Sequence, residues 1–258
     1  MGTKVKETCT VISQECIGKD IYSMWLQTKT IAGNAKPGQF VSVYTQDGGK
    51  LLPRPISLCE IDKEKGALRL VYRVTGKHTG TEGFSRLGAG AQLDLLGPLG
   101  NGFPLEEAEG KKVFLMGGGI GVPPMLETMK QLHAQKMAVL GYRDELFLDK
   151  EFAKNGDVYI ATEDGSAGTK GNVMDAIREN ALEADVIFAC GPKPMLRAIK
   201  AYALEKGIPC SMEERMACGI GACLGCVCQS TEVDSHSHVH NKRVCKDGPV
   251  FLSTEVEL

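Results

Sequence analysis

Hydrophobic and polar positions alternate in short runs along the first 105 or so residues. The runs are rich in β-branched and aromatic residues, and Gly, Pro, Asn and Lys separate them, as in CTVISQE, IYSMWLQT, QFVSVYT and LRLVYRV. Regularly spaced short strands with such turns are typical of an antiparallel barrel or sandwich. We therefore predict an N-terminal antiparallel β-barrel domain over residues 1–106.

From about residue 111, apolar runs alternate with longer segments of helical period. The predicted strands are KKVFLMGG, MAVLGYR, DVYIATED and ADVIFACG, and the predicted helices are VPPMLETMKQLHAQ, GNVMDAIRENAL and KPMLRAIKAYALEKG. Strands and helices that alternate in this way form βαβ units and a doubly wound parallel sheet. The pattern predicts an α/β domain over residues 107–210, which begins after the polar, glycine-rich segment GNGFPLEEAEG.

The last part of the chain, residues 211–258, has little apolar periodicity and holds half of the ten cysteines. A segment so short and polar cannot fold on apolar burial alone. A bound metal centre can supply the missing folding free energy. We therefore expect a small third lobe that is held together by a metal centre and by contact with its neighbours.

Composition and charge narrow the classes of partner and the cellular compartment. The 258 residues are 43% hydrophobic and 24% charged, and the formal net charge is -2. The chain has no dense Lys/Arg run of the kind that binds nucleic acid or a membrane, so we expect neither partner. The N-terminus lacks the pattern of a secretory signal and no segment has the length of a membrane span, so we expect a cytoplasmic protein. Because cytoplasmic thiols stay reduced, the ten cysteines indicate metal or redox chemistry rather than disulfides.

The stretch EERMACGIGACLGCVC contains the strongest chemical signal. Its spacing Cys218-x4-Cys223-x2-Cys226, followed by the distant Cys245, is the plant-type pattern of a [2Fe–2S] cluster. A structural zinc site is the main alternative, but it usually takes two C-x2-C pairs and only one is present here. Buried thiols without a metal are the remaining possibility.

Two other features of this region compete with that assignment. Cys228 could replace Cys245 as the fourth ligand, but on an extended chain it would point to the same side as Cys226 and compete for the same iron. The loop before Cys245 also contains an alternating histidine trio without nearby carboxylates. We expect its members to be solvated rather than bound to metal: His236, His238 and His240.

Two glycine turns indicate a nucleotide site. The first joins a predicted strand to a helix, where free N–H groups favour a pyrophosphate, and consists of Gly117, Gly118, Gly119, Ile120 and Gly121. Val122 stands where the dinucleotide fingerprint has its last glycine, so a merely tight turn fits the same letters. The second turn, Cys190-Gly191-Pro192, also follows a predicted strand and opens a helix. Two such turns at the carboxyl ends of strands in one sheet predict a ligand crevice.

The segment LLPRPISLCE in the first domain places an arginine and a serine on one predicted strand. Arg54 and Ser57 can bind phosphate and the edge of a ring. A kinked surface strand explains the same letters.

These segments together resemble the ferredoxin–NADP reductase superfamily. Arg54-Pro55-Ile56-Ser57 is similar to its flavin motif, residues 117–124 to its nicotinamide-nucleotide turn, and residues 190–195, CGPKPM, to its C-G-P-x-x-M motif. With the cysteine pattern after the nucleotide domain, nearly the whole chain resembles the family of electron-transfer subunits of NAD-dependent dihydroorotate dehydrogenases.

The resemblance implies an FAD on the barrel domain and a nicotinamide nucleotide on the α/β domain. The implied flavin residues are Arg54, Pro55, Ile56, Ser57, Val71, Tyr72, Arg73, His78 and Thr79. His78 stands where relatives are expected to have the glycine of a Gly-Thr pair, so it would offer only backbone contacts. The segment GPLGNGF at 97–103 is similar to a conserved family segment or shapes the domain junction. The implied nicotinamide residues are Gly117, Gly118, Gly119, Gly121, Cys190, Gly191 and Pro192.

The implied activity is electron transfer from NADH through FAD to the [2Fe–2S] cluster. A flavin is needed because it accepts a hydride and releases single electrons. The implied partner is a flavin (FMN)-containing catalytic subunit that oxidises dihydroorotate in pyrimidine biosynthesis. The resemblance implies a heterotetramer of two plus two subunits. We expect no catalytic acid or base in the present chain. Arg143 is followed at once by Asp144 and Glu145, which favours NAD over NADP.

Two alternatives stay open at this point. A reductase subunit of the same fold could serve sulfite reductase, hydrogenase or ferredoxin. A protein of another class, a regulatory scaffold with a zinc-stapled tail, would fit the cysteines without electron transfer.

Overall fold

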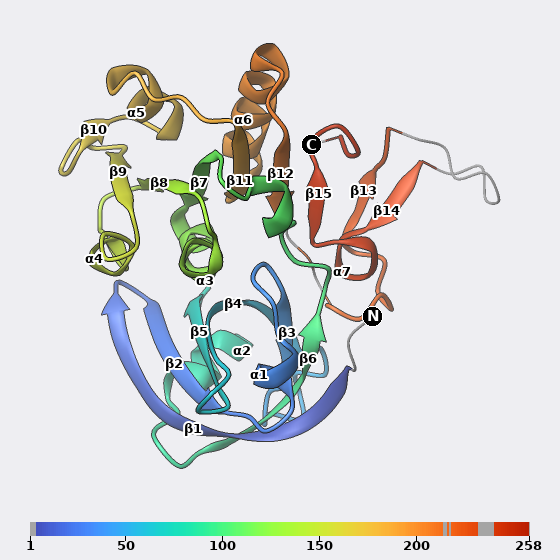
Figure 1. The fold of residues 1–258 in the computed structure, drawn as a ribbon. Helices are drawn as coiled ribbons and strands as arrows, with labels where there is room; N and C mark the ends of the chain where they lie inside the picture. The colour runs from blue at the N-terminus through green and yellow to red at the C-terminus, as the bar shows by residue number, and fades with distance from the viewer. Residues whose placement is uncertain (1–3, 214–215, 217, 232–239, 258) are drawn as a thin grey trace.

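The fold was taken from a computed structural model that describes residues 4–213, 216, 218–231 and 240–257. A barrel lies below a large sheet, and a small lobe at the C-terminal end of the chain lies beside both (Figure 1). The three parts follow the order expected from the sequence.

The N-terminal part is a closed antiparallel barrel of six strands, which confirms the predicted class. Its strands run in the order β1-β2-β5-β4-β3-β6. Every residue of Ala67–Tyr72 in β5 is buried, and the barrel interior holds Val11, Leu26, Val41 and Leu95. The strands and short helices are β1 (Val5–Gly18), β2 (Ile21–Gln27), α1 (Ile31–Asn34), β3 (Phe40–Val43), β4 (Arg54–Asp62), β5 (Ala67–Arg73), α2 (Gly80–Ser85) and β6 (Gln92–Leu99).

The second part is a seven-stranded sheet whose order is β10-β9-β8-β7-β11-β12-β15. All neighbouring strands are parallel except β12 and β15. The chain order reverses between β7 and β11, and open α/β sheets bind ligands at such a switch point. The strands are β7 (Lys112–Gly118), β8 (Gln135–Tyr142), β9 (Asp157–Thr162), β10 (Thr169–Lys170), β11 (Val186–Cys190), β12 (Cys210–Glu213) and β15 (Val250–Leu252).

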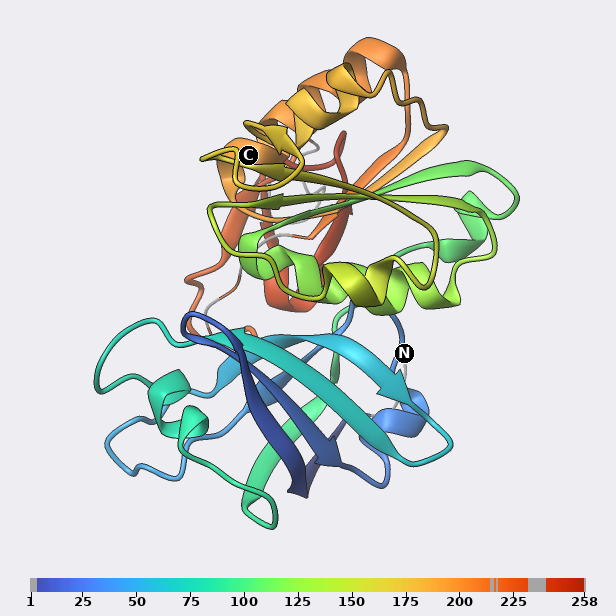
Figure 2. The same cartoon turned by 90° about the vertical axis from the view of Figure 1, so that its left-hand side faces the viewer.

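Helices cover both faces of this sheet, as a doubly wound fold requires. The face toward the barrel carries α3 (Val122–Gln131) and α4 (Asp149–Phe152), and the opposite face carries α5 (Val173–Glu179) and α6 (Lys193–Lys206) (Figures 1 and 2). Prolines stand in the first turn of α3, Asn172 caps α5, and Gly207 ends α6 in the left-handed conformation. Short 3-10 turns, η1 (Leu105–Ala108) and η2 (Gly119–Gly121), precede β7 and α3.

The C-terminal lobe packs on both larger parts. It contains the antiparallel pair β13 (Val227–Gln229) and β14 (Asn241–Arg243), followed by α7 (Val244–Asp247). Cys226, Val244 and Cys245 pack with Phe40 of the barrel. The chain then returns to the large sheet, where β15 pairs with β12. The expected division between residues 210 and 211 falls at the first residue of β12.

A buried ion-pair network joins the barrel to the helices below the sheet. The guanidinium of Arg69 in β5 lies 2.6 Å from the carboxylate of Glu60 in β4 and 2.5 Å from the carboxylate of Glu151 in α4. Lys130 of α3 lies 2.7 Å from the other oxygen of Glu60. The network fixes the barrel against α3 and α4 along the side that faces them.

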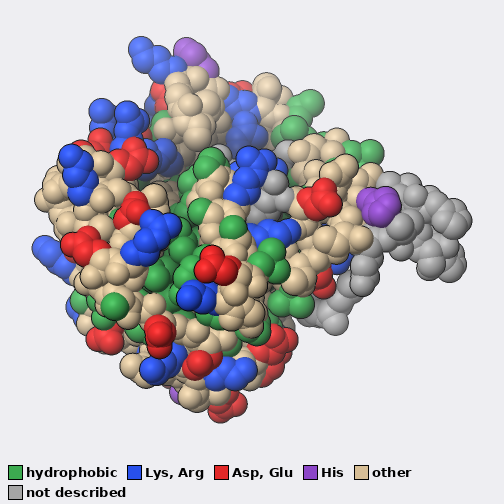
Figure 3. Space-filling model, turned by 90° about the horizontal axis from the view of Figure 1, so that it is seen from above, with side chains coloured by type: hydrophobic (Ala, Val, Ile, Leu, Met, Phe, Trp, Pro, Cys, Tyr) green, Lys and Arg blue, Asp and Glu red, His purple; other side chains and the backbone are tan. Residues whose placement is uncertain are grey.

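The molecular surface shows mixed charge over α5 and α6. Seen from above, Lys, Arg, Asp and Glu side chains surround a hydrophobic strip (Figure 3). Over the described ranges of the chain, no helix combines the length and apolar character that crossing a bilayer requires.

Candidate functional site

One cleft of about 450 Å³ brings the barrel motif and both glycine turns together. Its lining includes seven of the predicted barrel residues, namely Arg54, Pro55, Ile56, Ser57, Val71, Tyr72 and Arg73. Ile120 and Gly121 from the first turn, and Cys190 and Gly191 from the second, line the same cleft. The cleft therefore lies between two domains and at the switch point of the sheet, where a flavin and a nicotinamide could meet.

The two glycine turns pack directly against each other at this cleft. A Cβ atom on Gly121 would lie 2.3 Å from the carbonyl oxygen of Cys190, so a side chain there would displace backbone. Gly118 is similarly close to Met195 and Pro192. The predicted turn residues thus meet across β7 and β11, and their glycines keep the backbone close together.

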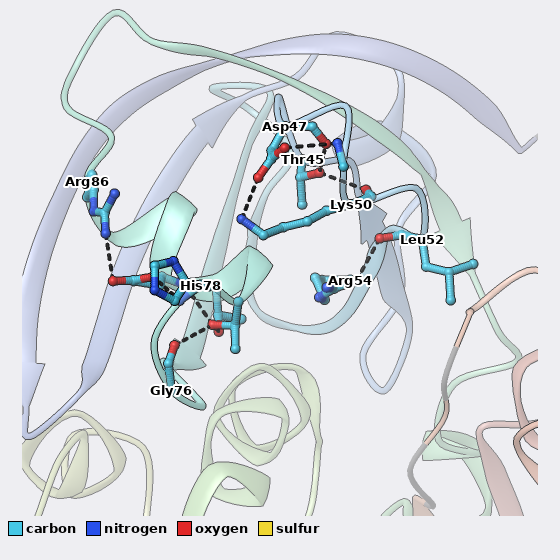
Figure 4. A network of polar contacts seen from close by, with 12 residues as sticks. Thr45, Asp47, Lys50, Leu52, Arg54, Gly76, His78 and Arg86 are labelled. Carbon is cyan, nitrogen blue, oxygen red and sulfur yellow. Dashed lines mark hydrogen bonds and ion pairs between the residues drawn. The ribbon is translucent and has the colours of Figure 1, made fainter.

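The barrel end of the cleft is built from the loop before α2. Thr79 caps α2, because its hydroxyl accepts from the backbone N–H of Glu82 at 3.2 Å. The side chain of His78 is exposed, and its backbone N–H donates to the Glu82 carboxylate (Figure 4). Thr75 and Thr81 line the cleft, and neither His78 nor Thr79 is part of its described lining.

The pair Gly80-Thr81 lies next to Arg54 of the flavin motif. It follows two residues after His78-Thr79, where the resemblance placed the Gly-Thr pair. A Cβ on Gly80 would lie 2.9 Å from the Nε of Arg54, so a side chain there would require the arginine to shift. Thr81 is buried at the cleft. The sequence contained a signal for this arrangement, since Gly80-Thr81 is itself a Gly-Thr pair.

A second hollow of about 290 Å³ continues beyond Gly80 on the barrel surface. Thr45, Lys50 and Arg86 are among its lining residues, and Lys50 forms a 2.6 Å ion pair with Asp47 (Figure 4). Arg54 lies near this network and donates to the carbonyl of Leu52 at 2.7 Å. Sequence reasoning did not find these residues, which could hold the second half of a dinucleotide.

A buried carboxyl group also faces the cleft. Glu213 ends β12, pairs in register with Cys190 of β11, and accepts a 2.5 Å hydrogen bond from the hydroxyl of Ser57. Burial raises the pKa of Glu213 to about 7, although the hydrogen bonds from Ser57 and Cys190 oppose the rise. The second carboxyl oxygen is buried and has no hydrogen-bond partner among the described residues. Sequence reasoning missed this residue, although an acid at the carboxyl end of a sheet strand is a signal for a site.

The four predicted metal-ligating cysteines lie in two pairs. The Sγ atoms of Cys226 and Cys245 are 3.4 Å apart, and the backbone N–H of Cys223 donates to the Sγ of Cys218 at 3.5 Å. Within the described ranges, no three His, Cys, Asp or Glu side chains converge on the position of one ion. Two pairs of thiolates fit a binuclear cluster, in which each iron takes two protein sulfurs.

Backbone donors gather around the first pair. Burial tends to raise the pKa of Cys218, but N–H groups of Cys223, Ile220 and Ala222 lower it to about 6. The N–H of Gly225 donates to the Sγ of Cys223 at 3.3 Å. Amide donors around a thiolate are the environment that an iron–sulfur cluster needs. The donor set therefore fits the expected cluster.

The structure describes the surroundings of two of the competing residues, Cys228 and His240. Cys228 points toward the carbonyl of Lys242, at 3.4 Å. His240 is exposed, and its carbonyl accepts from the N–H of Ser230. His236 and His238 lie outside the described residues.

A six-stranded barrel, a doubly wound sheet and a cysteine lobe around one shared cleft define an iron–sulfur flavoprotein reductase. Two family models match the chain: the oxidoreductase FAD-binding domain at residues 8–103, and the iron–sulfur cluster binding domain of dihydroorotate dehydrogenase B at residues 213–257. The chain is 46% identical to the dihydroorotate dehydrogenase B (NAD(+)) electron transfer subunit of Geobacillus sp. (strain WCH70), over 98% of this chain and 99% of the relative. It is 45% identical, with the same coverage, to the subunit of that name from Bacillus cereus (strain B4264).

Solved structures agree with this assignment. A structure described as NADH-dependent reduced ferredoxin-NADP oxidoreductase matches with a TM-score of 0.83 and 29% identity, over 96% of this chain and 89% of the other. A ferredoxin NADP+ reductase from Neisseria gonorrhoeae shares the fold, with a TM-score of 0.65 and 15% identity over 78% of this chain and 92% of the other. The chain belongs to the family of dihydroorotate dehydrogenase B (NAD(+)) electron transfer subunits.

Proposed function

We propose that this chain transfers electrons between NAD(H) and the catalytic subunit of an NAD-dependent dihydroorotate dehydrogenase in pyrimidine biosynthesis. The observation that carries the proposal is the single cleft in which the flavin motif of β4 meets the two glycine turns. The cysteine pairs lie in a lobe that packs on the same strand pair, β3 and β4. A route from nicotinamide through flavin to cluster then needs no large movement of the domains.

The residues that would hold FAD come from the barrel. Ser57 and the backbone of β4 and β5 would border the ring, while Arg54, Gly80 and Thr81 would border the phosphates. His78 and Thr79 would shape the turn that presents Gly80. When bound, the flavin supplies the exchange between two-electron hydride chemistry and one-electron transfer.

The nicotinamide would enter from the sheet side of the cleft. Gly117, Gly118 and Gly121 let the first turn pack closely on its neighbours, while a Cβ on Gly119 would meet open space. Cys190, Gly191 and Pro192 form the facing turn. Burial raises the pKa of Glu213 to about 7, so its protonated and ionised forms coexist near neutral pH, and its hydrogen bond orients the Ser57 hydroxyl. No group in this arrangement needs to abstract a proton from the substrate, since hydride moves directly between two aligned rings.

The nucleotide would be NAD rather than NADP. Asp144 and Glu145 follow β8 and are exposed, as is Arg143. The Glu145 carboxylate also accepts the backbone N–H of Lys19 at 2.7 Å, which holds it at the domain border. Two carboxylates at this loop would repel a 2′-phosphate. Comparable kcat/KM values for NADPH and NADH would contradict this assignment.

The cluster would be a [2Fe–2S] centre with the ligands Cys218, Cys223, Cys226 and Cys245. Three apolar side chains are exposed on its loop: Ile220 (49%), Leu224 (62%) and Val227 (42%). Apolar side chains grouped on a surface mark protein–protein contacts. We expect the FMN-containing catalytic subunit to cover this loop in a heterotetramer of two plus two subunits, in the cytoplasm.

The division into 1–106, 107–210 and 211–258 remains our proposal for the three functional parts. The third part would include β12 and β15, which belong to the large sheet by pairing. It would therefore be a lobe anchored in the nucleotide domain rather than an independent unit.

Cofactor analysis and reconstitution test the proposal. The purified chain should contain one FAD and about two irons and two sulfides, and should reduce artificial acceptors with NADH. It should oxidise dihydroorotate only after the catalytic subunit is added. A colourless protein that holds zinc would refute the proposal, as would dihydroorotate oxidation by this chain alone.

The docking face has its own test. Leu224→Lys should weaken coupling to the catalytic subunit at least tenfold, measured as the subunit concentration needed for half-maximal dihydroorotate oxidation. NADH oxidation with an artificial acceptor should stay unchanged. The matched control is Leu204→Lys, because Leu204 is exposed on α6 away from the cluster loop. Equal coupling in both variants would exclude the cluster loop as the contact face.

A further inference from the structure

Ser42 is a fully buried serine whose hydroxyl has no hydrogen-bond partner in the described part of the chain. It lies on β3 opposite Pro55 of β4 and is 0% exposed. Its Oγ forms no hydrogen bond to any described residue. A buried hydroxyl without a hydrogen-bond partner destabilises the folded protein, because its bonds to water are lost and not replaced. The Ser42 hydroxyl therefore destabilises the protein unless a bound group accepts a hydrogen bond from it.

The hydroxyl faces the loop of the metal-ligating cysteines. A Cβ atom on Gly219, the residue after Cys218, would lie 2.4 Å from the Oγ of Ser42 and 3.2 Å from the ring of Phe40. Gly219 has a φ of +73°, which favours glycine. The loop therefore runs directly over β3, with the smallest residue above the serine.

The flavin cleft offers a poorer explanation for the serine. Phe40 and Pro55 belong to the described lining of the cleft, but Ser42, which is the register partner of Pro55 on β3, does not. The side that Ser42 faces is occupied by the Cys218-Gly219 backbone. The acceptors expected there are the thiolate of Cys218 and the inorganic sulfides of the cluster.

We propose that Ser42 donates a hydrogen bond to a sulfur of the [2Fe–2S] centre on its Cys218 side and thereby raises the reduction potential of that centre. This inference rests on the proposed cluster site. Reduction adds one electron to the cluster, and the proton stays on the serine oxygen. A hydrogen-bond donor stabilises the more negative reduced form more strongly, so its loss makes reduction less favourable.

The test compares Ser42→Ala with the wild-type chain, both loaded with FAD and cluster. We expect the equilibrium between reduced and oxidised cluster to shift about tenfold toward the oxidised form, which lowers the midpoint potential by about 59 mV for a one-electron couple. EPR-monitored redox titration measures this shift, and the flavin potentials measured in the same titration should not change. Thr128→Val is the control, since it removes a buried hydroxyl that already donates to the Pro124 carbonyl in α3.

A second readout detects the hydrogen bond itself. After exchange into D2O, ENDOR spectra of the reduced wild-type cluster should show an exchangeable deuteron that is absent in Ser42→Ala. If the alanine variant does not retain its cluster, Ser42→Cys keeps the size and a weaker donor, and should give a smaller shift in the same direction.

The outcomes separate this inference from the proposed function. A wild-type protein without iron and sulfide refutes both. A wild-type protein with a normal cluster, whose potential and deuteron signal persist in the serine variants, leaves the function standing and refutes the role of Ser42. A shift confined to the flavin potentials would also refute it.

Discussion

Replacing Glu213 by glutamine should change how the stability of the protein depends on pH. Glu213 is buried at the end of β12, where one oxygen accepts from Ser57 and the other has no described partner. Burial disfavours the charged carboxylate and raises the pKa of the group from its ordinary value of 4.5 to about 7. Glutamine keeps the size and the hydrogen-bond acceptor but cannot ionise.

The size and sign of the effect follow from linkage. Below about pH 4.5 the carboxyl group is protonated in the folded and unfolded states, so its ionisation does not affect unfolding. Between pH 4.5 and 7 only the unfolded state loses the proton, so the stability of the wild type falls as the pH rises through the folded pKa. One pKa unit is about 1.4 kcal/mol, so above pH 7 the full loss is about 3 kcal/mol.

Thermal unfolding of the two flavin-loaded proteins from pH 5 to 8.5 measures this loss. For a chain of this size, about 3 kcal/mol corresponds to roughly 6 to 12 °C. The Tm of Glu213→Gln should therefore rise relative to the wild type by about that amount across the range. Glu106→Gln, at an exposed carboxylate of η1, is the control and should follow the wild type. Parallel profiles of the wild type and Glu213→Gln would show that the carboxyl group is ionised in the folded protein and would refute the reasoning.

Three further predictions test the lobe and the domain contact. Gly219→Ala should lose more than half of the iron and sulfide, measured by chemical analysis, because its Cβ would lie 2.4 Å from the Oγ of Ser42 at a positive φ; a full complement of iron would contradict the close packing. Cys245→Ser should lose the characteristic cluster spectrum while Cys228→Ser keeps it, since the thiol of Cys245 lies 3.4 Å from that of Cys226 and the thiol of Cys228 points toward the Lys242 carbonyl; loss of the spectrum in Cys228→Ser but not in Cys245→Ser would show that Cys228 is the fourth ligand. Arg69→Met should lower the free energy of unfolding by about 3 kcal/mol, because two carboxylates lose a buried cation; a change below 1 kcal/mol in chemical denaturation would show that solvent replaces the ion pairs.

The fold followed from the sequence because local patterns and tertiary packing agree. The β-branched runs before residue 105 close into the barrel, and each predicted βαβ unit appears in the sheet. The cluster ligands remain a prediction from the cysteine spacing, and the structure places the thiols of two of them, Cys226 and Cys245, 3.4 Å apart. Patterns of this kind depend on neighbours in sequence, which is why one sequence suffices.

The residues that were missed depend on contacts between distant parts of the chain. Nothing in the neighbouring sequence distinguishes Glu213 from other acidic residues. In the structure, β12 places it next to Cys190, and its carboxyl group lies 2.5 Å from the Ser57 hydroxyl. Ser42 became a candidate only because the loop at Gly219, more than 170 residues later in the chain, crosses over it. The turn before α2 was ambiguous for another reason, since His78-Thr79 and Gly80-Thr81 both end in threonine and only the structure shows that Thr81 lines the cleft.

The return of the chain to the large sheet explains how so small a lobe can hold an electron carrier in place. Cys226 and Cys245 pack on Phe40 of the barrel, and five residues after Cys245 the chain enters β15, which pairs with β12 next to Glu213. The lobe thus contacts β3, the neighbour of the flavin-motif strand β4, and it is paired through β15 to β12, the strand that ends at the cleft. Electron transfer requires fixed spacing between carriers, and a lobe held by both domains keeps that spacing only while the domains keep theirs. The Arg69 network, on the other side of the same interface, fixes the barrel against α3 and α4, so loss of that network should disturb the cluster site as well as the cleft.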